Sequence, residues 1–235
     1  MARSTVVFAS GQLLTKAVWA PQIAALSPDY DVLVADHTHD DTIDGMARRL
    51  LAAAPQRFHL IAHAMGGFTA FDVMRHAPER VISLVLIATL APDDGPAQTE
   101  RRQGYIRLVE DGNFDGVVEE RIPILVHPAR RGDEALLGVI RTMASDTGPE
   151  RFLRQQRAIM RRIDSRPTLA AIKVPTLLVR GDADGITTVA HQDEILAGIL
   201  GSRLVIIADC GHLPTLEKPH AVNQILETWL GKDVG

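Results

Sequence analysis

The segment with the clearest chemical potential is Phe58-His59-Leu60-Ile61-Ala62-His63-Ala64-Met65-Gly66-Gly67, where an apolar run gives way abruptly to a helix-like run. A strand that enters a helix through so tight a turn lifts its central side chain above the sheet, as a G-x-S-x-G turn does with a nucleophile. Such a turn needs small residues two positions before and after its centre, and Ala62 and Gly66 meet that need. The centre is Ala64, whose methyl group cannot attack a substrate. The sequence therefore predicts a nucleophile turn without its nucleophile.

The same segment, followed by Phe68-Thr69-Ala70, resembles the S-M-G-G turn of the α/β-hydrolase superfamily, particularly its small carboxylesterase-like members. The resemblance implies serine at position 64. Dehalogenases and epoxide hydrolases of this superfamily use aspartate there, but they usually follow it with Trp, whereas Met-Gly-Gly follows Ala64.

The resemblance also assigns two partners, since the family's order along the chain is Ser, Asp, His. Gly181-Asp182-Ala183-Asp184 resembles the family's G-x-x-D acid loop, which makes Asp184 the acid, although Asp182 and Asp184 alone could be turn residues. The segment 211–219 resembles the G-H-x-P-x-x-E-x-P signature, which makes His212 the general base. His212 would take a proton from a hydroxyl at position 64, and Asp184 would hold the imidazole tautomer.

Backbone N–H groups are expected to form the oxyanion hole. Met65, directly after the turn, would supply one of them. The other should come from Ser10-Gly11-Gln12-Leu13, which replaces the family's H-G-x; we assign it to Gln12, with Leu13 as the neighbouring alternative. Trp19 fits the family's W-x-x-Q pattern and is expected to pack rather than to contact substrate.

A competing metal site is suggested by His37-Thr38-His39-Asp40-Asp41, which resembles the H-x-H-x-D-H zinc motif of metallo-β-lactamases. Histidine and aspartate are good zinc ligands, so a metal-dependent hydrolase using His37 and His39 is a remote alternative. Thr42 stands where the last histidine should be, and downstream ligands are not evident. We favour a loop in which Asp41 or Thr42 caps a helix that begins at Ile43.

Two other reactive residue types lie near the motifs. Cys210 precedes His212 by two positions and could be imagined as a nucleophile, but a structural role is favoured because the turn at Ala64 is the one built to present a nucleophile. His59 and His63 flank that turn, and for His63 packing or a supporting hydrogen bond is favoured over chemistry.

Short, nearly continuous apolar runs alternate with helical stretches, which predicts an α/β fold: a mostly parallel sheet flanked by helices. The expected strands are 5–9, 31–35, 58–62, 82–88, 174–180 and 203–207. The expected flanking helices are 18–26, 43–54, 66–76, 189–200 and 221–230.

Residues 92–173 lack a convincing strand and hold helix-like stretches at 102–111, 117–126, 134–143 and 150–163. About 80 residues are too many for a loop, so we expect a helical cap inserted into a core of residues 1–91 and 174–235. Arg154, Arg157 and Arg161 in this insert could meet an anionic substrate group. The alternative, which we favour, is a solvated face opposite an apolar stripe that includes Phe152 and Ile159.

Composition sets the remaining bounds. With 46% apolar residues, 23% charged residues and one cysteine, the chain should form a large core without an internal disulfide. The apolar run near the start is too short for a signal peptide or membrane span, so a cytoplasmic location is expected. The net charge of −4 gives no reason to expect nucleic-acid binding.

The resemblance thus implies a serine esterase that needs no cofactor and acts on a small-molecule, ester-type substrate. The helices of the expected cap suggest that this substrate is medium-sized and largely apolar. Thioesters, lactones, amides and peroxyacid formation would suit the same triad. Three explanations of Ala64 are open: a deliberate Ser→Ala change, a natural pseudoenzyme that binds a ligand as a receptor, or a different nucleophile. The intact loops around Asp184 and His212 favour the first.

Overall fold

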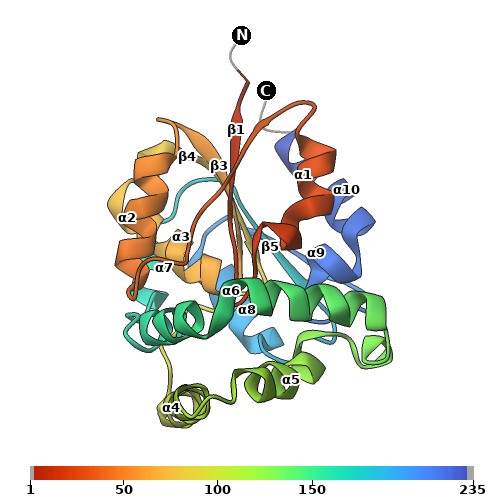
Figure 1. The fold of residues 1–235 in the computed structure, drawn as a ribbon. Coiled ribbons are helices and arrows are strands. Elements are labelled where there is room, and N and C mark those ends of the chain that lie inside the picture. Colours follow the sequence, from red (N-terminus) through yellow and green to blue (C-terminus); the bar gives the residue numbers. More distant parts are fainter. Residues whose placement is uncertain (1–2, 232–235) are drawn as a thin grey trace.

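The computed structural model describes residues 3–231, and at its centre lies a six-stranded sheet in the order β2-β1-β3-β4-β5-β6 (Figure 1). All neighbouring strands are parallel. Strands β3 and β5 are buried along their whole length, as strands covered on both faces should be. The prediction of a mostly parallel α/β sheet is confirmed. The strands are β1 Thr5–Ala9, β2 Asp31–Val34, β3 Phe58–His63, β4 Val81–Ile87, β5 Thr176–Gly181 and β6 Arg203–Ile207.

Helices cover both faces of the sheet. On one face lie a 3₁₀ helix (Lys16–Trp19), α1 (Ala20–Leu26) and α10 (Pro219–Leu230). On the other lie α2 (Ile43–Ala53) and α3 (Met65–His76), with α7 (Arg166–Leu169) and α8 (Val189–Gly198). Figure 1 shows α2 and α3 on the opposite side of the strands from α1 and α10. Each face has its own apolar cluster, so the sheet is held between two cores.

Helix α2 shows how local sequence sets an element. Ile43, Met46, Ala47 and Leu50 are buried at the spacing of one helical face. The Thr42 side chain accepts a hydrogen bond from the Gly45 N–H at 3.1 Å, which makes Thr42 the N-cap. Of the two expected capping residues, the structure therefore selects Thr42.

Between β4 and β5 every element of regular secondary structure is a helix. This segment contains α4 (Pro96–Glu110), α5 (Phe114–Leu125), a short 3₁₀ helix (Pro128–Arg130) and α6 (Glu134–Met160) before α7. Figure 1 shows α4, α5 and α6 gathered beyond the carboxyl ends of the strands. No helix in the described part of the chain is both long and apolar enough to cross a membrane.

Helix α6 joins two stretches that the sequence predicted as separate. Gly148 has φ 73° and ψ 167° inside it, and Pro149 follows. A left-handed glycine before a proline interrupts the helical backbone, so the expected break is present as a sharp kink. The start of α4 at Pro96 is earlier than predicted because proline suits the first turn of a helix. The helical nature of the insert is as expected, while its role as a separate cap domain stays a prediction.

Candidate active site

Ala64 lies between β3 and α3 in a backbone conformation that is rare for a residue with a side chain, with φ 50° and ψ −113°. Its N–H donates to the Ile87 carbonyl at 2.9 Å, and its carbonyl accepts from the Thr89 hydroxyl at 2.8 Å. A Cβ on Gly66 would lie 2.0 Å from the Ala9 carbonyl oxygen. The turn is therefore wedged against β1, and only glycine fits two residues after its centre.

Backbone strain gathers around this turn. Among residues 3–231, the non-glycine residues with positive φ are Leu13, Ala64, Ala88 and Asp209. They follow β1, β3, β4 and β6, all at the carboxyl ends of strands. Residues held in sparsely populated conformations cost about 1–3 kcal/mol each and cluster at functional sites. Ligands of open α/β sheets bind at this same edge.

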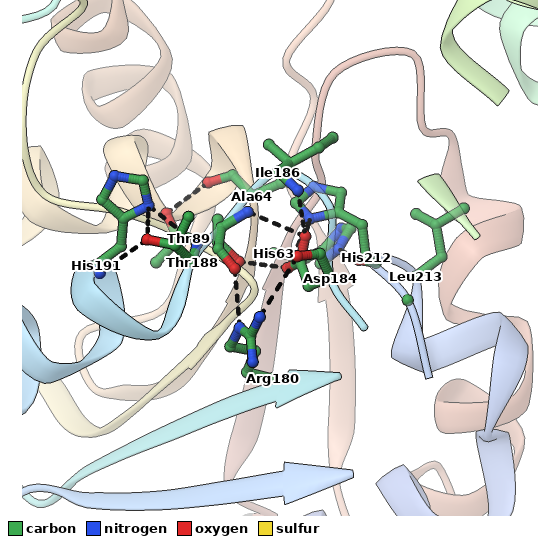
Figure 2. Close-up of polar contacts among 12 residues, drawn as sticks. His63, Ala64, Thr89, Arg180, Asp184, Ile186, Thr188, His191, His212 and Leu213 are labelled. Atoms are coloured by element: carbon green, nitrogen blue, oxygen red, sulfur yellow. Dashed lines mark hydrogen bonds and ion pairs between the residues drawn. The ribbon is translucent and has the colours of Figure 1, made fainter. Parts of the chain in front are cut away.

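His212 and Asp184 meet beside the turn (Figure 2). His212 Nδ1 lies 3.0 Å from both carboxylate oxygens of Asp184, and both side chains are almost fully buried. An ionised carboxylate accepts only, so Nδ1 carries the proton and Nε2 remains as the ring's acceptor. His212 and Ala64 line the same cavity. The structure brings all three predicted residues together from three strand ends.

The Asp184 carboxylate is further fixed by its own loop. It accepts from the N–H of Ile186 at 2.8 Å, from the N–H of Thr187 at 3.0 Å and from the Thr187 hydroxyl. Burial raises the pKa of Asp184, but the charge of His212 and the hydrogen bonds from His212 and Thr187 outweigh it and hold this pKa below its ordinary value. Asp184 is thus an ionised partner for an imidazolium.

Two charged residues hold the loops: Arg180, which the sequence did not single out, and Asp182. The Arg180 guanidinium donates to the Thr187 carbonyl at 2.8 Å, with longer bonds to the carbonyls of Asp182 and Asp184 (Figure 2). Asp182 accepts from the N–H groups of Asp209 and Cys210 at 3.1 and 3.0 Å. The acid loop is therefore tied to the histidine loop through Asp182, which is the turn role considered for it.

The histidine loop is also tied to the helical insert. Glu217 accepts from the N–H of Gly211 at 2.9 Å and from the N–H of His127 at 2.7 Å. The His212 N–H donates to the Leu125 carbonyl, at the end of α5, at 3.0 Å. These bonds give a physical reason for a glutamate in the 211–219 signature, because a buried carboxylate satisfies several backbone donors at once.

The two predicted oxyanion donors, Gln12 and Met65, both line the cavity beside Ala64. Within residues 3–231 neither backbone N–H donates a hydrogen bond. The alternative donor, Leu13, is wrong: its N–H donates to Gln155 Oε1 at 3.1 Å, so it is already satisfied. Gln155 comes from α6, and no sequence signal marked it.

The cavity beside Ala64 has a volume of about 90 Å³. Most of its lining is apolar, from Leu14, Phe68, Leu90, Ile159 and Leu213 among others, as expected for the acyl or alcohol part of an ester. Arg102 and Arg121 reach it from α4 and α5. The predicted arginines of α6 do not line it. Arg154 donates to the Thr38 carbonyl, Arg157 pairs with Glu110 and Arg161 pairs with Asp41, which agrees with a solvated face.

His63 and His37 hold backbone near the site, whereas His39 does not. His63 is fully buried, and its Nε2 lies 2.8 Å from the His212 carbonyl. Burial and the nearby His212 lower the pKa of His63 to about 3, so it is neutral. His37 Nδ1 lies 3.1 Å from the Ser10 carbonyl, whereas His39 is exposed and pairs with Asp36. In the described residues, no three His, Cys, Asp or Glu side chains gather as metal ligands.

Trp19 and Cys210 also take structural positions. Trp19 is fully buried, stacks on Phe8 at a centroid distance of 4.5 Å and donates from Nε1 to the Ser10 hydroxyl at 2.9 Å. Ser10 thus uses its side chain to hold the loop. The Cys210 thiol is buried, and burial raises its pKa beyond its ordinary value, which disfavours the thiolate.

The model of the family described as alpha/beta hydrolase matches residues 6–225. A protein of Pseudomonas savastanoi pv. phaseolicola carrying the name carbamate hydrolase RutD is 27% identical, over 91% of this chain and 88% of the relative. The 3-oxoadipate enol-lactonase 1 of Acinetobacter baylyi is 25% identical, over 94% and 86%. The solved structure of a thermophilic esterase from Thermogutta terrifontis, with malate bound, has a TM-score of 0.89 at 27% identity, covering 98% of this chain and 90% of that one.

Proposed function

The chain belongs to the alpha/beta hydrolase family, and from that premise we propose that it carries the site of a carboxylic-ester hydrolase whose nucleophile position is occupied by Ala64. The related proteins include an esterase and an enol-lactonase, and both names describe cleavage of an ester bond. The proposed substrate is a small ester or lactone. As it stands, the chain binds such a molecule without forming an acyl-enzyme.

One observation carries this proposal: the Asp184–His212 pair is complete, buried and adjacent to a strained turn with a methyl group at its centre. An alanine that served only for packing would not require the strained backbone angle φ of 50°. A histidine with Nδ1 bound to a carboxylate and Nε2 free is the arrangement of a general base. These features support a serine-hydrolase site that lacks its hydroxyl.

With a serine hydroxyl at position 64, the chemistry follows from the remaining groups. The hydroxyl oxygen would attack the ester carbonyl while His212 Nε2 takes its proton, and Asp184 would stabilise the imidazolium. The N–H groups of Met65 and Gln12 would bind the developing oxyanion. His212 would then give the proton to the leaving alcohol and deprotonate the water that releases the acid.

The test is Ala64→Ser. Removing the nucleophile of a serine hydrolase typically costs about 10⁶ in kcat, so the substitution should raise hydrolysis of p-nitrophenyl acetate and butyrate by several orders of magnitude. A fluorophosphonate probe should label the Ala64→Ser protein and leave the unchanged chain and the double variant Ala64→Ser, His212→Ala unlabelled.

A second reading follows from Ala64 itself: the protein is a binding module that holds its ligand without turnover. It predicts that Ala64→Ser stays inert across ester chain lengths although an ester still binds in the cavity, measured by calorimetry. That result would exclude the hydrolase proposal. If the Ala64→Ser protein hydrolyses an ester and the added change His212→Ala abolishes this activity, the hypothesis that the site serves only for binding is excluded.

A further inference from the structure

The small cavity beside Ala64 has a much larger neighbour. This outer cavity has a volume of about 660 Å³ and lies against α4, α5 and the acid loop. The two cavities share Leu90, Arg102, Arg121 and Ile186 in their lining. These four side chains therefore lie between the two cavities, at a place that part of a ligand with its carbonyl at Ala64 would reach.

Arg121 is one of two cations at this junction, the other being Arg102. Arg121 projects from α5, is only partly exposed, and donates from one terminal nitrogen to Gln12 Oε1 at 2.8 Å. Its guanidinium carbon lies 5.7 Å from the Phe152 ring centroid and 6.0 Å from that of Tyr105. The attraction between a cation and the face of an aromatic ring is weak and does not neutralise the positive charge.

Arg121 has no carboxylate to balance it within residues 3–231, whereas Arg102, Arg162 and Arg166 each pair with one. Asp94 bonds Arg102 at 2.5 Å and Arg162 at 2.8 Å, so one carboxylate already serves two guanidinium groups. Burial and the charges of Arg102 and Arg101 lower the pKa of Arg121 to about 10, which still leaves it charged at neutral pH. A desolvated cation without a counter-ion is unfavourable.

Unused hydrogen-bond donors lie beside it. The Nε2 of Gln12 and the Nε2 of Gln156 are buried and have no acceptor among the described residues. The oxygen of each amide is occupied, in Gln12 by Arg121 and in Gln156 by Arg102 at 3.1 Å. Each glutamine is thereby oriented with its NH₂ group left over. Buried polar groups are normally paired, so the unused donors indicate an acceptor that belongs to a ligand.

We propose that the junction of the two cavities is a carboxylate subsite, in which Arg121 and the amide of Gln12 bind a free carboxylate on the substrate, several atoms from the ester carbonyl at Ala64. A guanidinium presents two parallel N–H groups in the geometry of a carboxylate. The inference rests on the proposed function and narrows it: the substrates are esters or lactones that also carry an acid group. It differs from the largely apolar substrate that the sequence predicted.

The test uses the unchanged chain, in which Ala64 prevents turnover. Calorimetry should compare monomethyl glutarate with its neutral counterpart dimethyl glutarate at pH 7. The acid should bind about 10- to 100-fold more tightly, as a charge-assisted hydrogen bond to a buried group implies. Arg121→Gln should abolish this preference, so that the two esters bind equally, and Arg121→Lys should restore part of it. Arg107→Gln, an equal charge change at an exposed position of α4, should have no effect.

The outcomes separate the subsite from the hydrolase proposal. If the two esters bind the unchanged chain equally, or if Arg107→Gln acts like Arg121→Gln, the subsite is refuted whatever Ala64→Ser does. If Ala64→Ser is inert while Arg121 still decides carboxylate binding, the hydrolase proposal fails and the subsite stands. Thermal unfolding of each variant shows whether it folds. If Arg121→Gln does not fold, the comparison of the two esters is made with Arg121→Lys.

Discussion

Gln155 accepts a hydrogen bond from the Leu13 N–H at 3.1 Å, although the two residues lie 142 positions apart in the chain. The same amide donates to the His37 carbonyl at 3.3 Å, and the side chain is almost completely buried. Leu13 has φ 61° and directly follows Gln12, which lines the cavity beside Ala64. A residue of the helical insert thus fixes the loop that supplies a predicted oxyanion donor.

Gln155→Leu should weaken catalysis through this loop. In the Ala64→Ser protein we expect kcat to fall by about 10- to 100-fold with little change in KM, because the unsatisfied Leu13 N–H costs about 1–3 kcal/mol and the loop shifts. Gln155→Glu keeps the acceptor and should retain more of the activity. Steady-state kinetics with a p-nitrophenyl ester measures both. A change in KM alone, or equal losses in the two variants, would contradict a positioning role.

Asp184→Asn tests the acid assignment in the Ala64→Ser protein. The amide cannot stabilise an imidazolium and favours the wrong imidazole tautomer, so kcat should fall by about 10⁴. The matched control is Asp182→Asn, which changes a carboxylate on the same loop that accepts from backbone N–H groups of the histidine loop and does not touch the imidazole of His212. Its effect on kcat should be much smaller. If the two variants lose similar activity, Asp184 is not the acid.

The sequence predicted the parts of the site that depend on local pattern. The apolar runs gave the six strands because buried parallel strands must be apolar on both faces, and the turns after β3, β5 and β6 carried recognisable spacing. Asp184, His212 and Ala64 could therefore be placed at strand ends before the structure was known. Thr42 as a helix cap followed from the same local logic.

Contacts between distant segments could not be predicted in this way. Gln155, Arg121 and Arg180 act through partners that only the folded chain brings near, and glutamine or arginine on a helix or strand carries no distinctive local signal. The arginines that did show helical spacing, Arg154 and Arg161, lie toward solvent or the loop after β2. Periodicity shows which face of a helix is buried and leaves open what that face touches.

Ala64→Gly tests the strain in the turn. Glycine adopts φ 50° and ψ −113° without the Cβ clash, so relief of strain should exceed the entropic cost of glycine and stabilise the protein by roughly 0.5–1 kcal/mol. Ala62→Gly is the control, since Ala62 is fully buried within β3 and the same loss of a methyl group should destabilise the fold. Urea unfolding at pH 7 compares the two. Destabilisation by Ala64→Gly would show that the turn is unstrained.

His63 should make the protein sensitive to acid. Its pKa is lowered to about 3 by burial and by His212, whereas an unfolded histidine titrates near 6.5. Below pH 6.5 His63 takes up a proton in the unfolded chain but stays neutral in the folded protein. The contribution of neutral His63 to the free energy of unfolding is therefore fully present above pH 6.5 and is lost as the pH falls toward 3. The slope is about 1.4 kcal/mol per pH unit, or about 2 kcal/mol between pH 7 and 5. Urea unfolding at both pH values should show that His63→Gln removes most of this difference, with the exposed His220→Gln as control. An unchanged pH dependence in His63→Gln would mean that His63 is protonated in the folded protein.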